Sequence, residues 1–156
     1  MNFEDNTIEY LDASLTKLDW LDFTESSNEI SDLLEERSIS ERSFVLKVDF
    51  GMATPEIHSD NSYTTKLLYK FTIQDSETRN ISFAILSAFL TINFKPEYPY
   101  AQHPETFDSN TKNRLIDLII KNNWPSLKVT LQAILDSNKF GSVIKLPILF
   151  KEALEK

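Results

Sequence analysis

The sequence predicts an α+β fold: a four-stranded antiparallel sheet with C-terminal helices packed on one face. Residues that alternate with a period of two fill the first part of the chain, and residues with helical spacing follow after position 108. Strands that come first and helices that come later indicate an antiparallel sheet whose helices are segregated to one side. The chain has no internal repeat and no break in composition, so we expect a single domain over residues 1–156.

Three segments show the strand pattern most clearly. Residues 44–50 and 63–73 alternate between two faces, and QDSETRN at 74–80 predicts a hairpin connection to a third strand at 81–94. The mixed alternation of 13–23 is typical of an edge strand with an irregularity. The sheet is therefore expected to contain four strands.

The strand at 81–94 is apolar on both faces, which predicts that both faces are covered. We expect the domain's own helices on one face and another protomer or a bound chain on the other. Leu90 is predicted to be among the residues that face another protomer. The two faces carry Phe83, Ile85 and Phe89 on one side and Leu86, Leu90, Ile92 and Phe94 on the other.

The remaining segments predict helices and their connections. The acidic insert at 24–43 contains NEISDLLEER, which favours a short amphipathic helix or an irregular excursion. Residues 95–105, with three prolines, predict an extended crossover loop that leads into a helix. A kink or break is expected at Trp124-Pro125, with a new helix beginning at Pro125. A short final helix is expected around 148–155.

Composition excludes several classes of protein. The chain has no cysteine and only two glycines, which argues against disulfide frameworks, thiolate chemistry and phosphate-binding glycine loops. A net charge of −8 disfavours nucleic-acid binding and leaves open either plain solubility or an acidic face for a basic partner. The N-terminus lacks the apolar core of a signal peptide, and the apolar stretches are too short to span a membrane, so we expect a cytoplasmic protein.

No residue constellation predicts catalysis. His58 and His103 are isolated, and His58-Ser59-Asp60 cannot form a triad because adjacent loop residues do not converge as a triad requires. The acidic residues lack the spacing of a calcium loop. We therefore expect no enzyme activity, no metal and no cofactor.

At 44–94 and 113–154 the pattern resembles the SecB family of export chaperones. Trp124-Pro125 resembles the Phe-Pro step in that family's helix, and Leu146-Pro147-Ile148-Leu149-Phe150-Lys151-Glu152-Ala153-Leu154 resembles the signature that opens its last helix. The insert at 24–43 is longer than the family's first connection. The chain ends at Lys156 without the family's tail that contacts the SecA motor ATPase, so SecA is left open as a partner.

The resemblance implies an ATP-independent holdase for unfolded polypeptides or preproteins, assembled as a homotetramer or dimer. The alternatives are a dedicated chaperone of a toxin–antitoxin system and an oligomeric scaffold of the same fold without general chaperone activity. Aromatic residues of the sheet either fill the core or line a groove for extended peptides. The candidates for peptide binding on the sheet and crossover are Phe71, Phe83, Phe94, Tyr98 and Tyr100.

Overall fold

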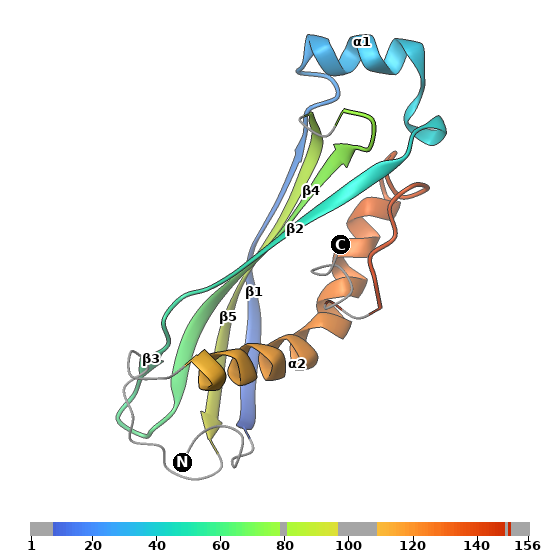
Figure 1. Ribbon diagram of the computed structural model, residues 1–156. Coiled ribbons are helices and arrows are strands. Elements are labelled where there is room, and N and C mark those ends of the chain that lie inside the picture. Colours follow the sequence, from blue (N-terminus) through green and yellow to red (C-terminus); the bar gives the residue numbers. More distant parts are fainter. Residues whose placement is uncertain (1–7, 79–80, 97–108, 149, 151–156) are drawn as a thin grey trace. The chain divides into compact units, whose positions relative to one another are not determined.

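The computed structural model describes residues 8–78, 81–96, 109–148 and 150, and its elements are shown in Figure 1. The strands are β1 (Ile8–Asp22), β2 (Phe44–Met52), β3 (Glu56–Ile57), β4 (Tyr63–Asp75) and β5 (Ser82–Pro96). The helices are α1 (Asn28–Glu36), the single 3-10 turn η1 (Ile39–Glu41) and α2 (Ser109–Asp136). The expected crossover loop and final helix lie wholly or largely outside the described residues.

The strands form one antiparallel sheet in the order β1-β5-β4-β2, which confirms the predicted α+β class. The sheet has a fifth member that the sequence did not predict, because β3 is only two residues long. It pairs antiparallel with β4, with Glu56 opposite Thr64 and Ile57 opposite Tyr63. β1 lies at one end of the order, as expected for the edge strand at 13–23.

The chain divides into two compact units. The first unit contains residues 1–17, 50–68 and 88–123, and the second contains residues 18–49, 69–87 and 124–156. β1, β2, β4, β5 and α2 each contribute residues to both units. The organisation as a single domain stays a prediction.

In the first unit, one face of β4 and β5 packs under the N-terminal part of α2. Tyr63 of β4 stacks on Phe94 of β5, with ring centroids 5.2 Å apart and an interplanar angle of 9°. Leu115 and Ile119, one helical turn apart on α2, are both buried. Leu90 is 5% exposed and belongs to this core, so the prediction that it faces another protomer is wrong.

The second unit has two aromatic clusters. Trp124 of α2 lies 5.8–6.1 Å from Phe71 and Tyr69 of β4 and 5.0 Å from Phe150, measured between ring centroids. In the other cluster, Phe140 packs edge-to-face on Trp20 and Phe44, with ring centroids 5.8 and 5.7 Å apart. Phe44 in turn packs edge-to-face on Phe83, with centroids 5.3 Å apart. Offset and edge-to-face pairs of this kind stabilise a core beyond the area they bury.

α2 is one helix with Pro125 inside it, so a break with a new helix start at Pro125 is wrong, and the kink given as the alternative to a break stays a prediction. The missing N–H of Pro125 costs a backbone hydrogen bond to the carbonyl of Lys121. Burial of Trp124 and Leu127 on either side of the proline offsets that loss. The Asn123 side-chain amide donates to the carbonyl of Ile119 at 2.9 Å in the turn just before.

Beyond α2, the side chain of Gln132 helps to hold the following chain against the helix. The Gln132 amide donates to the carbonyl of Ile144 at 3.2 Å and accepts from the N–H of Leu146 at 2.8 Å, as a neighbouring strand would. Gly141 allows the chain after α2 to pass close to the end of the helix, because a Cβ at position 141 would lie 2.6 Å from the carbonyl oxygen of Leu135. A side chain at position 141 would therefore displace the end of α2.

Candidate functional site

The predicted peptide contacts divide into buried residues and residues outside the described part. Phe71 is 1% exposed, and Phe83 and Phe94 have no exposed surface. Tyr98 and Tyr100 lie outside the described residues. The three phenylalanines therefore lie in the core, which was one of the two alternatives that the sequence left open for the sheet aromatics. A role in peptide binding stays a prediction for all five candidate residues.

An open apolar groove lies at the end of β2 in the first unit. Its volume is about 210 Å³, and we call it the β2-end groove; its lining residues are Phe50, Met52, Ala53, Thr54, Pro55, Lys112 and Ile116. The strand side is fixed to β4, because the N–H of Ala53 donates to Lys66 at 2.9 Å and the hydroxyl of Thr65 donates to the Ala53 carbonyl at 2.6 Å. These two bonds hold the strand side of the groove against β4.

The helix side of this groove comes from two residues one turn apart. Lys112 and Ile116 have the i, i+4 spacing that places side chains on the same helix face. The groove can therefore accept an apolar side chain, and the ammonium of Lys112 can pair with a carboxylate beside it. Met52 gives one wall a flexible side chain that adapts to ligands of different shape.

Sequence reasoning missed this groove. Ile116 lies in α2 beside the buried residues Leu115 and Ile119 and is itself only half-buried. An apolar residue next to the buried face of the helix was the signal that the sequence offered.

β1 exposes apolar side chains along an edge of the sheet. Leu15, Leu18 and Leu21 are 43%, 36% and 51% exposed. The strand is 15 residues long, whereas most strands have about 3–10 residues. A long edge strand with exposed leucines offers both backbone groups and side chains for pairing with another chain.

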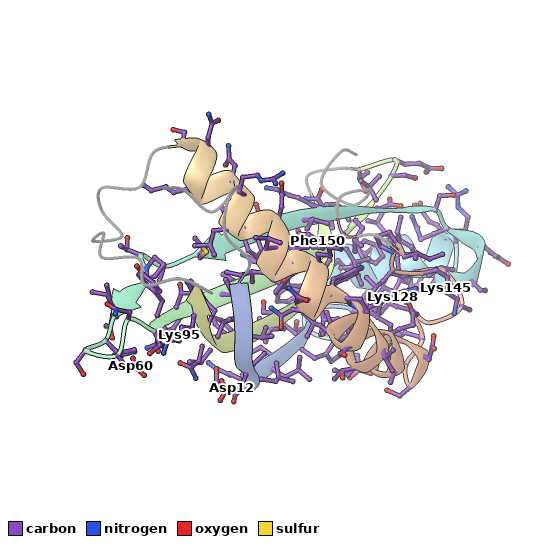
Figure 2. The ribbon with its side chains drawn as sticks, turned by 90° about the horizontal axis from the view of Figure 1, so that it is seen from below. Asp12, Asp60, Lys95, Lys128, Lys145 and Phe150 are labelled. Atoms are coloured by element: carbon purple, nitrogen blue, oxygen red, sulfur yellow. The ribbon has the colours of Figure 1, made fainter. Side chains whose placement is uncertain are left out.

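Polar side chains form a row in the first unit. His58 Nε2 lies 2.7 Å from the hydroxyl of Thr64, that hydroxyl donates to Asn93 at 2.5 Å, and the Asn93 amide donates to Asp12 at 2.6 Å. Figure 2 shows Asp12 on the side of the strands away from the N-terminal part of α2. The row therefore links β4, β5 and β1 across the strands, and it accounts for His58 without catalysis.

The pKa values of two aspartates are shifted by structural contacts. Partial burial raises the pKa of Asp22, but hydrogen bonds from Thr24 and the ammonium of Lys139 outweigh it and hold the pKa below its usual value. Hydrogen bonds from Ser62 lower the pKa of Asp60 in the same way. Within the described ranges, no group of three or more potential metal ligands is found. No helix there is long and apolar enough to cross a membrane.

Comparisons with known proteins give similarity only at the level of solved structures. No protein-family model matches the chain, and no curated protein matches it either. A SecB-like chaperone from Mycobacterium tuberculosis, solved with a peptide from an antitoxin, aligns with a TM-score of 0.48 at 12% identity over 91% of this chain and 90% of its own. A protein of unknown function from Streptococcus agalactiae aligns with a TM-score of 0.46 at 10% identity over 91% and 98%.

Proposed function

We propose that this protein binds extended, non-native segments of other polypeptides and acts as an ATP-independent holdase. The observation that carries the proposal is the β2-end groove, an open apolar hollow between the end of β2 and the first turns of α2. Such a groove takes up one apolar side chain of a client. Modest affinity at each site is sufficient when a long client contacts several sites.

Two of the predicted peptide contacts come shortly before the helix side of the β2-end groove in the sequence. Tyr98 and Tyr100 precede α2, whose first turns supply Lys112 and Ile116 to the groove. We propose that these two tyrosines add aromatic contacts to a client held there. Phe71, Phe83 and Phe94 would contribute only if the core opened, because they are buried.

The experiment measures binding of reduced and alkylated α-lactalbumin, a chain that remains unfolded. Met52→Asp combined with Ile116→Asp should weaken binding about tenfold or more, as loss of a central apolar pocket does. Val129→Asp is the matched control, since Val129 is 70% exposed and lies outside the groove. Unchanged affinity in the groove variant with an unchanged melting temperature would refute the assignment.

Self-association through β1 is the second part of the proposal. The exposed leucines of β1 favour pairing with a second copy, which would hide an otherwise unprotected edge. Leu15→Lys with Leu21→Lys should lower the mass measured by light scattering. An unaltered mass, or a monomeric wild-type protein, would exclude β1 as the interface.

The client range distinguishes the general holdase from its alternatives. Suppression of aggregation of several unrelated proteins supports general chaperoning. Binding of one client alone indicates a dedicated chaperone, such as that of a toxin–antitoxin system, and no client binding indicates a scaffold. Export, the SecA partner and the cytoplasmic location stay predictions of the resemblance.

A further inference from the structure

A separate groove lies in the second unit beside α1. It has a volume of about 350 Å³, and we call it the α1 groove; its lining residues are Leu34, Ser38, Ile39, Ser40 and Lys139. Ile39 of η1 is buried, whereas Leu34 in the last turn of α1 is half-buried. The groove is therefore apolar at its base, with two serine hydroxyls among its lining groups.

The insert side of this groove is held by a buried arginine. Arg42 forms an ion pair with Asp75 at 3.2 Å, with both side chains 3% exposed or less. Its guanidinium also donates to the carbonyl of Arg37 at 2.8 Å and to the carbonyl of Leu33. These bonds hold the end of α1 and the turn that follows, so the groove does not have to be ordered when a ligand binds.

The opposite side is held by Lys139. Its ammonium pairs with Asp22 at 3.2 Å and also contacts the hydroxyl of Thr24. The cation at this wall is therefore already neutralised by a carboxylate of its own unit. It offers little attraction to an anionic ligand.

The surface around the groove is acidic and largely uncompensated. Segment 24–43 holds six acidic and two basic residues, and the guanidinium groups of Arg37 and Arg42 are bound to Glu77 and Asp75. Four exposed acids of α1 form no ion pair with another described residue. They are Glu29, Asp32, Glu35 and Glu36.

Two of these acids lie where a negative charge destabilises helix α1. Glu35 and Glu36 lie in the last turn of α1, where the helix dipole is negative, and no basic residue is in that turn. A cation supplied from outside would interact favourably with both carboxylates. Neither Glu35 nor Glu36 lines the groove, but both follow Leu34 directly in the chain, so residues that flank a side chain inserted beside Leu34 would reach them outside the groove.

We propose that the α1 groove binds a basic segment of a partner polypeptide. One aliphatic or leucine-like side chain of that segment enters between Leu34 and Ile39, and flanking lysines or arginines pair with Glu35 and Glu36. This surface is distinct from the β2-end groove and goes beyond the holdase function. It assigns the acidic insert a role in recognising a partner by charge and by one apolar anchor.

The test uses a fluorescein-labelled nonapeptide of lysines with a single central leucine. Glu35→Lys with Glu36→Lys should weaken binding at least about tenfold at low salt, since charges at a docking surface become repulsive. The control, Glu56→Lys with Asp117→Lys, makes the same change in net charge at exposed positions of the first unit and should change affinity less than about twofold. An equal loss in both pairs would overturn the proposal.

The anchor is tested with a second peptide in which serine replaces the leucine. Leu34→Ser should weaken binding of the leucine peptide and leave that of the serine peptide unchanged. Circular dichroism confirms that each variant is folded. The double variant Met52→Asp, Ile116→Asp should bind the leucine peptide with unchanged affinity, and this result would separate the α1 groove from the proposed holdase surface. If the wild-type protein binds both peptides equally, the proposed apolar anchor is refuted. If the Glu35→Lys, Glu36→Lys variant loses self-association, the occupant is a second copy of this chain and the proposed basic partner segment is refuted.

Discussion

The two units use different interactions to hold the same long elements. The second unit packs Trp124 among Phe71, Tyr69 and Phe150 and contains the buried ion pair of Arg42 and Asp75. The first unit places a hydrogen-bonded polar row on a sheet face and an open apolar groove beside α2. The comparison teaches that each unit combines a packed core with an open groove. The units differ in the polar interaction beside that core, which is a buried ion pair in the second unit and a hydrogen-bonded row in the first.

The largest effect is expected at the aromatic cluster of the second unit. Trp124→Ala removes contacts to three rings and the hydrogen bond from its indole nitrogen to the Pro147 carbonyl at 3.1 Å. We expect a loss of about 3–5 kcal/mol in the free energy of unfolding, measured with urea. Val129→Ala on the same helix is the control and should change little, because Val129 is exposed. A small effect of Trp124→Ala would show that the cluster does not dominate.

The buried ion pair gives the next test. Arg42→Met removes the cation that pairs with Asp75 and, among the described residues, leaves the hydroxyl of Thr78 donating to it at 2.7 Å. Removing one partner of such a pair costs about 3–5 kcal/mol. The double variant Arg42→Met, Asp75→Leu should recover part of the loss, since no buried charge remains. No recovery would show that the hydrogen bonds to the insert are the main contribution.

The polar row of the first unit should contribute less. Asn93→Ala removes the amide between Thr64 and Asp12, and we expect a loss of about 0.5–1.5 kcal/mol because these groups can bond to water instead. Amide hydrogen exchange should increase near Asp12, the β1 end of the row. Faster exchange throughout the second unit would contradict the division between the units.

The ion pair of Asp22 and Lys139 predicts a dependence on pH. The pKa of Asp22 is lower in the folded protein than its ordinary value, so its contribution to stability is present above that ordinary value and is lost as the pH falls through the lower folded value. The difference in urea midpoint between the wild-type protein and Asp22→Asn should therefore shrink below about pH 4. A difference that grows on acidification would show the opposite sign.

The smallest effect is expected for the exposed ion pair of Arg37 and Glu77. Its atoms lie 2.7 Å apart, closer than those of Arg42 and Asp75, but its side chains are 43% and 61% exposed. Solvent screening leaves such a pair with little net effect on stability. Arg37→Ala should therefore lower the urea midpoint far less than Arg42→Met. Equal losses would mean that burial does not decide the strength of these pairs.

Local pattern in the sequence predicted the four longer strands and offered the short helix as one of two alternatives for its segment. The alternation in 63–73 predicted β4, and Ser27 begins α1 because its hydroxyl accepts a hydrogen bond from the N–H of Ile30 at 3.3 Å. Ile30, the first apolar residue of that predicted stripe, is buried. These features depend on side chains a few residues apart, which the sequence shows directly.

Only the tertiary structure decided which faces are covered and which grooves remain open. Alternation assigned Phe71 and Phe94 to faces of strands, but it cannot say whether a helix or a ligand lies over a face. At Pro125 the local rule predicted a new helix, and the burial of Trp124 against β4 outweighed it. The β2-end groove depends on Met52 and Ile116, which are 64 positions apart in the numbering and come together only through folding. Contacts over such separations are set by packing, since local sequence constrains only neighbouring residues.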